Sequence, residues 1–203
     1  MKKYLIANWK MNGSFSTNQK LLEDLANKLE FLESGDLISN VSLVICPSFL
    51  HLCQVGDFIK ARGLSWHLGA QNLAFKAQGA LTGEISASML QDLGLSHVII
   101  GHSERRQIFK EDSNTINLKL QLAFSHELIP VLCVAELSEL EASLSVLQHY
   151  AKSPCLIAYE PLWAIGTGKT PELKDLEDFH GQVQVFLKQK GLDFPILYGG
   201  SLN

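Results

Sequence analysis

The residues from Ile157 to Lys169 carry the clearest chemical pattern in the sequence. An apolar run ends in a carboxylate, Glu160, and a stiff Pro161-x-Trp163 follows it. The stretch continues with Ile165, Gly166, Thr167, Gly168 and Lys169. Glycines let amide N–H groups approach an anion without a Cβ in the way, and a proline beside a bulky aromatic makes a defined hinge for a moving lid. The pattern predicts a general base next to a phosphate-binding lid, or else a Gly-rich turn after a buried strand.

Two further side chains and a second glycine loop add to this chemistry. Lys10 supplies a fixed cation that can stabilise an anion or a developing oxyanion, and His102 can serve as an acid or an electrophile. Gly199-Gly200-Ser201 offers backbone amides that can hold a phosphate near a helix start. The sequence contains no nucleophile elbow, no Ser/His/Asp order and no metal-ligand cluster. Acid–base chemistry on a small phosphorylated carbonyl compound, without a metal, fits these residues best.

Short apolar runs predict the strands that must position these side chains. Most of the runs are continuously apolar, as strands buried on both faces are. The runs are Tyr4–Ala7, Val41–Cys46, Trp66–Ala70, His97–Ile100, Ile129–Cys133, Cys155–Tyr159 and Pro195–Tyr198. Leucine spacing typical of helices lies between them at Leu21–Leu32, at Leu137–Leu147 and at Leu173–Leu187. A capping-box pattern, Ser16-x-x-Gln19, precedes the first of these helices.

The alternation of strands and helices predicts parallel strands joined by crossovers. A doubly wound sheet and a (β/α) barrel both have this organisation, and both collect their chemistry at the carboxyl ends of the strands. Polar residue types stand at most of the predicted strand ends, among them Lys10, Gln71, His102 and Glu160. We therefore expect one site built from several strand ends. The irregular stretch Gln71–Ile85 predicts a functional Ω-loop.

Composition argues against a nucleic-acid or membrane protein. The 203 residues carry a net charge of −4, and no block of five or more basic residues occurs. The apolar stretch near the N-terminus is too short for a signal peptide or a membrane span, so a cytoplasmic location is expected. The four cysteines form no Cys-x-x-Cys pair. They predict buried free thiols in a reducing compartment.

Six motifs of the sequence resemble those of the triosephosphate isomerase family. They occur in the family's order along the whole chain, and as a set they are very specific. The motifs are Ala7–Asn12, Gly69–Asn72, Gly79–Glu84, Ile100–Arg106, Ala158–Lys169 and Tyr198–Ser201. The resemblance implies a TIM (β/α)8-type barrel, with residues 1–203 as a single domain that covers about seven of the eight strand–helix units. It implies a cofactor-free enzyme of glycolysis and gluconeogenesis that interconverts dihydroxyacetone phosphate and D-glyceraldehyde 3-phosphate.

The resemblance also assigns roles through the known mechanism of that family. Glu160 would move a proton between the two substrate carbons through an enediolate. His102, kept neutral, would polarise the carbonyl and shuttle protons between the substrate oxygens. Lys10 would stabilise the enediolate and the phosphate. Asn8 would orient the substrate, and Glu104 would hold Lys10 and Asn8 in place.

Phosphate binding and dimerisation are implied in the same way. The main-chain N–H groups of Gly166 and Ser201 would bind phosphate once a lid, residues 161–171, closes. Closure would exclude water and suppress loss of phosphate from the enediolate. The Gln71–Glu84 loop would insert into a second subunit and bring Thr82 to the partner's active site, so a homodimer is expected.

The sequence departs from the family pattern in three respects. It stops at Asn203, where the family continues with an eighth strand, whose Gly-Gly pair completes the phosphate site, and a final helix. Ala135 stands where the family has glycine, and the stretch from Cys133 to Ala158 is shorter than usual. The leading expectation is an isomerase whose sequence lacks its C-terminal part. The alternative is a truncated barrel that folds or dimerises without turnover.

Overall fold

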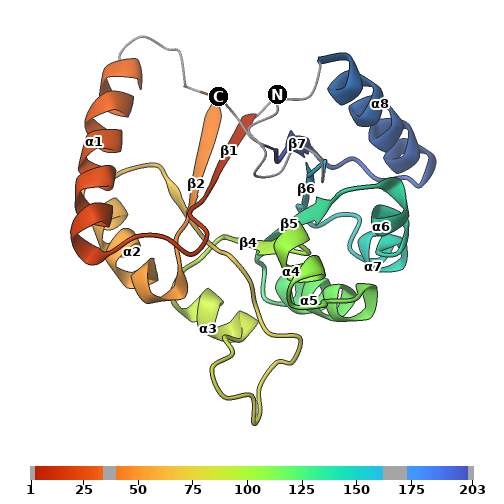
Figure 1. The fold of residues 1–203 in the computed structure, drawn as a ribbon, viewed down its shortest axis with the longest axis horizontal. Coiled ribbons are helices and arrows are strands. Elements are labelled where there is room, and N and C mark those ends of the chain that lie inside the picture. The colour runs from red at the N-terminus through yellow and green to blue at the C-terminus, as the bar shows by residue number, and fades with distance from the viewer. Residues whose placement is uncertain (1–2, 34–39, 162–172, 201–203) are drawn as a thin grey trace. The chain divides into compact units, whose positions relative to one another are not determined.

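Helices alternate with parallel strands along the chain in the computed structural model of the protein (Figure 1). The structure describes residues 3–33, 40–161 and 173–200. Residues 1–71 and 90–97 form one compact unit, called unit 1 here, and residues 72–89 and 98–203 form a second, called unit 2. That residues 1–203 make a single domain stays a prediction.

Unit 1 is a parallel three-stranded arrangement covered by helices. Its strands are β1 (Lys3–Asn8), β2 (Val41–Cys46) and β3 (His67–Ala70), in that order in the sheet. Its helices are α1 (Phe15–Glu33), a 3-10 turn η1 (Phe49–His51) and α2 (Leu52–Ala61). Leu22 of α1, Ile45 of β2 and Val55 of α2 are fully buried in one apolar cluster, so both helices pack on the same face of β2 (Figure 1).

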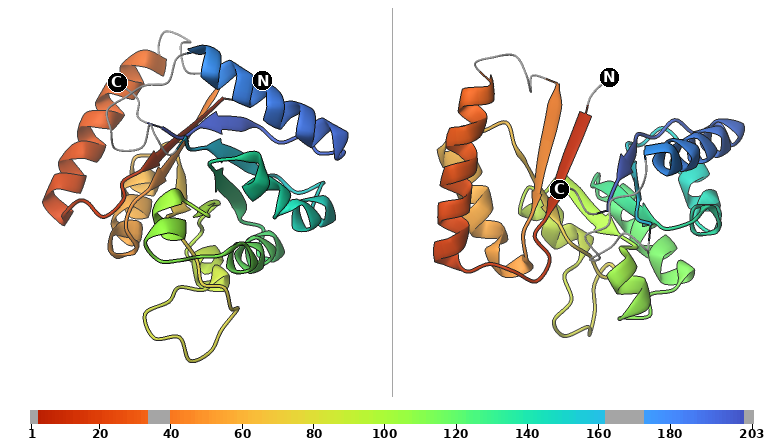
Figure 2. Two further views of the ribbon diagram at one scale, coloured as in Figure 1. Left: turned by 45° about the vertical axis from the view of Figure 1, so that its right-hand side comes forward. Right: turned by 45° about the horizontal axis from the view of Figure 1, so that its top comes forward.

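Unit 2 repeats this organisation with more elements. Its strands follow one another in the order β4 (His97–Ile100, whose first residue belongs to unit 1), β5 (Ile129–Val134), β6 (Leu156–Tyr159) and β7 (Ile196–Tyr198). The helices are α3 (Ala87–Asp92), which begins in unit 2, α4 (Ser103–Gln107), α5 (Ser113–Ser125), α6 (Leu137–Glu141), α7 (Leu144–His149) and α8 (Leu173–Gln189). Helices α5 and α6 contact β5, and α8 contacts β7; Figure 2 shows these helices and strands from two further directions.

The strand order distinguishes the two folds that the sequence left open. Cys133 of β5 pairs with Ala158 of β6, and Ala158 pairs with Leu197 of β7, all in parallel register. In each unit the strands are ordered as they occur along the chain. A doubly wound sheet reverses its strand order at a switch point, whereas a (β/α) barrel does not. The predicted TIM-type (β/α) barrel class is therefore the one that fits.

All seven strands were predicted at their observed places, with bounds that differ by at most one residue. β2, β4 and β5 are buried almost throughout. Because such strands are covered on both faces, each leaves an unbroken apolar run in the sequence.

Two helix predictions were wrong in detail. Helix α1 is capped by Ser14, whose hydroxyl accepts from the Thr17 N–H at 3.3 Å, while the Thr17 hydroxyl accepts from the Ser14 N–H at 2.8 Å. Gln19 of the predicted capping box instead donates to Glu23. The leucine spacing over Leu137–Leu147 predicted one helix, but the structure has two, α6 and α7.

The predicted Ω-loop is present between β3 and α3. The Ala74 N–H donates to the Ile85 carbonyl at 2.8 Å and closes the base of the loop. In Figure 1 and in both views of Figure 2 the loop extends away from helix α3. Thr82 of this loop is exposed.

The cysteines are free thiols, and most of them lie in the interior of the protein. All four cysteines are free thiols, and Cys46, Cys133 and Cys155 are buried, as predicted. Burial raises the pKa of the Cys46 thiol to about 12, so that thiol stays protonated and packs as an apolar group. Among the described helices, none combines the length and the apolar character that a bilayer crossing requires.

Candidate active site

Glu160 directly follows β6 and is held by two neighbouring elements of unit 2. Its N–H donates to the carbonyl of Val134, the last residue of β5, at 2.8 Å. Its side chain is buried, and Oε2 accepts from the Ser103 N–H at 3.0 Å. The carboxylate is therefore oriented by the first residue of helix α4, while its main chain continues the β5–β6 ladder.

His102 links the end of β4 to α4 and faces the same carboxylate. It is the N-cap of α4, and its Nδ1 accepts from the Glu104 N–H at 3.2 Å. Its Nε2 lies 3.2 Å from Glu160 Oε1. When the ring is neutral, accepting at Nδ1 requires the proton to be on Nε2. The ring then presents a donor toward the carboxylate and toward anything that binds beside it.

Glu104 contacts the same histidine with its side chain. Its Oε2 lies 3.6 Å from His102 Nδ1, and the side chain is 42% exposed. The distance makes an ion pair only if the imidazole is protonated, whereas the shorter contact from the Glu104 N–H requires Nδ1 to be unprotonated. The shorter contact determines the state of Nδ1, because its donor is a main-chain N–H that helix α4 holds in place, whereas the Glu104 carboxylate is 42% exposed and lies farther away.

Asn8, the last residue of β1, contacts Lys10, two residues farther along the chain in unit 1. The Lys10 N–H donates to Asn8 Oδ1 at 3.0 Å, and the Gln71 side-chain amide donates to the Lys10 carbonyl at 3.0 Å. The same amide donates to the Cys46 carbonyl at 2.9 Å. Lys10 has a φ of 53°, a left-handed conformation that is uncommon for a residue other than glycine. Such strain concentrates at functional sites.

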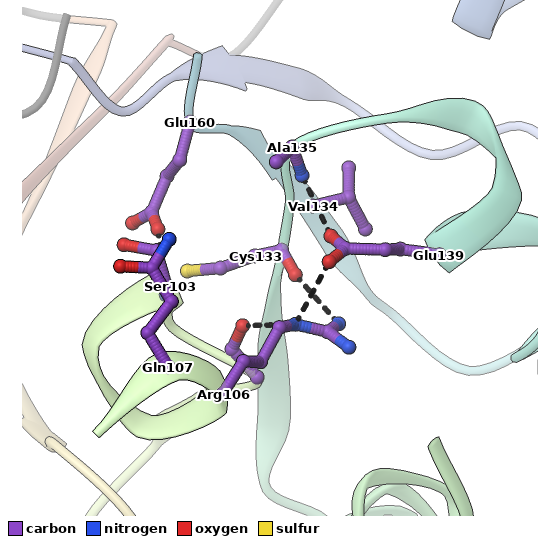
Figure 3. A pocket seen from close by; sticks show the side chains of 9 residues that line it. Ser103, Arg106, Gln107, Cys133, Val134, Ala135, Glu139 and Glu160 are labelled. Atoms are coloured by element: carbon purple, nitrogen blue, oxygen red, sulfur yellow. Dashed lines mark hydrogen bonds and ion pairs between the residues drawn. The ribbon is translucent and has the colours of Figure 1, made fainter. Parts of the chain in front are cut away.

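A cavity of about 150 Å³ opens beside Glu160 in unit 2 (Figure 3). Its lining includes Ser103, Arg106, Cys133 and Glu139. Figure 3 shows the Arg106 guanidinium reaching across the end of β5 toward the Glu139 carboxylate. The cavity thus has the candidate base on one side and a partly buried cation–carboxylate pair on the other.

A second buried ionic network supports the base of the Ω-loop. The Lys119 ammonium, which is almost fully buried, donates to Asn72 Oδ1 at 2.7 Å and to Glu111 Oε1 at 2.5 Å. Arg105 Nε donates to the same Glu111 oxygen at 2.6 Å. Burial lowers the pKa of Lys119, and the hydrogen bond that Lys119 donates to Glu111 opposes that shift. Asn72 begins the loop, so the network ties the loop to helix α5.

Several predicted site residues lie outside the described part of the chain. These are Trp163, Ile165, Gly166, Thr167, Gly168 and Lys169 of the lid, and Ser201 of the second glycine loop. Pro161, the first lid residue, is described and is buried. Among the described residues, no group of three or more His, Cys, Asp or Glu side chains is placed to hold a metal ion.

Sequence reasoning missed the groups that position the site. The Ser103 N–H, the guanidinium of Arg106 and the carboxylate of Glu139 were not singled out. Gln71 was noted only as a polar residue at a strand end. A residue type does not indicate which main-chain group it will contact. The available signals were the strand-end position of Gln71 and the occurrence of Ser103 and Arg106 in the motif Ile100–Arg106.

The fold and the site together define a class of protein, a (β/α)-barrel protein with a strand-end carboxylate facing a histidine. The sequence profile of the triosephosphate isomerase family matches residues 3–203. The chain belongs to the triosephosphate isomerase family, and this membership confirms the predicted family, fold class and enzyme class.

Individual relatives give the same result. Proteins named triosephosphate isomerase from Colwellia psychrerythraea, Clostridium tetani and Endomicrobium trichonymphae are 38%, 37% and 39% identical to the chain. The alignments cover 97%, 100% and 100% of this chain and 82%, 84% and 86% of the relatives.

Proposed function

We propose that the protein interconverts dihydroxyacetone phosphate and D-glyceraldehyde 3-phosphate, as a cytoplasmic enzyme of glycolysis and gluconeogenesis that needs no cofactor. Family membership supports the substrate class. The observation that carries the proposal is the pairing of Glu160 with His102, whose nearest atoms are 3.2 Å apart. An isomerase of this kind needs a carboxylate base and a proton donor side by side, and this pair supplies both.

Glu160 is the proposed base. It would take a proton from one substrate carbon and return it to the other, with an enediolate between the two steps. The hydrogen bond from the Ser103 N–H uses only Oε2, so Oε1 remains directed to His102 and to the space beside it. A base held in a defined direction reaches the reacting carbon without a search for the productive rotamer.

His102 is the proposed electrophile and proton shuttle. Its Nδ1 is occupied by the Glu104 N–H, so a neutral ring carries its proton on Nε2. From there it would donate to the substrate carbonyl and then exchange the proton between the two oxygens. Glu104, the neighbour that supplies this N–H, is proposed to fix the ring and to support Lys10 and Asn8, as the family resemblance implies.

Charge stabilisation is proposed for Lys10 and substrate orientation for Asn8. The Lys10 main chain is fixed on both sides, by Asn8 Oδ1 and by the Gln71 amide. An ammonium acts as a point charge on an anion, so it can serve both the phosphate and the enediolate oxygen. The main-chain N–H groups of Gly166 and Ser201 are proposed to bind the phosphate, under a lid of residues 161–171.

We also propose a homodimer in which the Ω-loop carrying Thr82 inserts into the partner. Large apolar side chains are exposed in both units, including Met11, Leu50, Ile108 and Phe109, with exposed fractions of 63% or more. Exposed apolar side chains of this size favour burial against a partner. Sedimentation at micromolar concentration tests the proposal, and a monomer whose Thr82→Arg variant sediments identically would contradict it.

The test of the isomerase is turnover of D-glyceraldehyde 3-phosphate by the chain, by Glu160→Gln and by Glu141→Gln. Glu141 is an exposed residue of α6 and serves as the control. Removing a positioned general base lowers the rate by about 10²–10⁴-fold, so we expect kcat to fall to that extent in Glu160→Gln alone. Equal turnover in all three proteins would refute the role of Glu160. Folded protein without any turnover would favour a barrel that does not catalyse.

A further inference from the structure

Glu160 is hydrogen-bonded to two elements, β5 and α4, and both hydrogen bonds form only while these elements keep their separation. Its main-chain N–H donates to the Val134 carbonyl at the end of β5, with an N···O distance of 2.8 Å. Its carboxylate accepts a hydrogen bond of 3.0 Å from the Ser103 N–H at the start of α4. If the end of β5 and the start of α4 move apart, the carboxylate cannot keep both contacts. The geometry of the base therefore depends on whatever fixes α4 to β5.

Arg106 makes that connection. It lies in α4, three residues after Ser103, and its Nε donates to the Gly101 carbonyl at 2.7 Å. Its Nη2 donates to the Cys133 carbonyl near the end of β5 at 3.1 Å. One planar side chain thus binds the end of β4 and the end of β5 to the helix that supports Glu160 (Figure 3).

Glu139 completes the connection from α6. Its Oε1 lies 3.6 Å from Arg106 Nε, and its Oε2 accepts from the Ala135 N–H at 2.7 Å. The two charged side chains are only 13% and 24% exposed, so solvent screens their attraction incompletely. The carboxylate holds the guanidinium in place and also fixes the main chain that leaves β5.

We propose that Arg106 and Glu139 are a positioning pair that sets the orientation of Glu160, an inference that rests on the proposed isomerase function. Neither side chain touches the reacting atoms. They act by holding constant the distance between the Ser103 N–H and the Val134 carbonyl. Arginine is required because its fork of donors reaches two carbonyls at once, whereas a lysine ammonium at the end of a flexible stem keeps the charge without the fixed fork.

The first test is Arg106→Lys, with kcat and KM measured separately. A displacement of about 1 Å at a reacting group costs about 10²-fold in rate, so we expect kcat to fall by about 10- to 100-fold. KM should change little, because the guanidinium and the carboxylate are already engaged with main-chain groups of the protein. Glu139→Gln keeps an acceptor for the Ala135 N–H and removes only the charge, so its loss of kcat should have the same direction and be smaller.

Glu141→Gln is the matched control, because Glu141 lies in the same helix as Glu139 and is exposed. A purely structural role would lower the unfolding midpoint of Arg106→Lys and leave kcat of the folded protein unchanged. That result, with KM also unchanged, would overturn the proposal. If Arg106→Lys does not fold, Glu139→Gln decides, and wild-type kinetics in Glu139→Gln would overturn it equally.

A readout that needs no turnover separates this proposal from the proposed function. The amide signal of Ser103 in nitrogen–proton NMR spectra should follow the ionisation of Glu160, since its N–H donates to that carboxylate. Glu160→Gln should abolish this pH dependence and so assign it. Arg106→Lys should reduce its amplitude, and Glu141→Gln should not. If the protein has no turnover and Arg106→Lys still reduces the amplitude of the Ser103 shift, the positioning pair is supported and the isomerase function is refuted. If the Arg106→Lys enzyme is active and its Ser103 shift has the wild-type amplitude, the isomerase function is supported and the positioning pair is refuted.

Discussion

The two units hold their candidate site residues by different means. In unit 2, contacts reach the functional side chains, because Glu160 Oε2 and His102 Nδ1 each accept from a backbone N–H and so direct Oε1 and Nε2. In unit 1, the contacts at Lys10 fix its main chain, through Asn8 on one side and Gln71 on the other. The hydrogen bonds at the acid–base pair therefore orient side chains, and those from Asn8 and Gln71 fix the main chain from which the Lys10 side chain extends.

The difference follows from the chemistry that each group is proposed to perform. A carboxylate base must present one oxygen to one carbon, so a small error in direction is costly. An ammonium acts as a point charge and tolerates several directions, provided that its stem starts from the right place. The left-handed backbone at Lys10, with a φ of 53°, costs about 1–2 kcal/mol. Its two main-chain hydrogen bonds offset a cost of that order at about 1 kcal/mol each.

Gln71→Met should have the largest effect on stability among these variants, because it removes a side chain that supports the main chain of Lys10 in unit 1. The Lys10 carbonyl would lose the donor contributed by Gln71, while the Cys46 carbonyl would keep the Trp9 N–H. The Lys10 carbonyl is partly buried. An acceptor that loses its donor away from solvent costs about 1–3 kcal/mol, and we expect the free energy of unfolding in urea to fall within that range. Gln148→Met is the control, since Gln148 donates to an exposed carbonyl at 3.3 Å. If both variants lose the same free energy of unfolding, the hydrogen bond from Gln71 to the Lys10 carbonyl contributes no more to stability than an exposed one.

Gly101→Ala tests the side-chain support in unit 2. Gly101 has a φ of +73°, and a Cβ there would lie 2.8 Å from Arg106 Nη2. The left-handed strain of an alanine costs about 1–2 kcal/mol, and the displaced guanidinium should in addition disturb Glu160 and lower kcat.

Gly63→Ala is the matched control for Gly101→Ala. Its φ is +62°, and a Cβ there meets nothing within 4 Å. Both variants should lose a similar free energy of unfolding from backbone strain, measured in urea. Only Gly101→Ala should lose turnover, so a proportionate loss in Gly63→Ala would mean that strain rather than the position of Arg106 is responsible.

The strands and the helices differed in how well the sequence predicted them. A strand such as β4 is buried at every position, so its composition alone marks it. The break between α6 and α7 has no such local mark, because Ala142 and Ser143 are not helix breakers. There the Asn117 side chain of α5 donates to the Ala142 carbonyl at 2.9 Å, at the end of α6. The spacing of leucines reports only local periodicity, so it could not predict a helix end at which a residue from a distant part of the sequence makes a contact.

The candidate site divides in the same way. Glu160, His102 and Lys10 were found because reactive residue types stood at strand ends, where parallel β/α folds collect their chemistry. Arg106 and Glu139 were not, because their partners are main-chain carbonyls and N–H groups that every residue possesses. The sequence therefore predicted which groups react and left out the groups that hold them in place.

The smallest expected effect concerns the pH dependence of unit 2. Burial lowers the pKa of His180 in α8 below its ordinary value of 6.5, and its Nε2 has no hydrogen-bond partner in the described part of the chain. Well above pH 6.5 the imidazole is neutral in both the folded and the unfolded states. As the pH falls through that value, the unfolded chain takes up the proton first, so the folded state loses stability. His180→Gln should remove this part of the acid sensitivity.

Helix α8 covers β7, and its Phe179 ring stacks on Tyr159, the residue before Glu160, with ring centroids 3.5 Å apart. Acid loosening of α8 should therefore weaken β6, the strand that carries the base. Amide hydrogen exchange at about pH 5.5 measures this directly. His180→Gln should restore protection at Ile157 of β6 and leave Leu43 of β2 unchanged, because only unit 2 contains the substituted helix. Equal changes at both amides would show that the histidine affects the stability of the whole protein. The two units would then unfold as one cooperative unit, and the difference in how each holds its site residues would not extend to their stability.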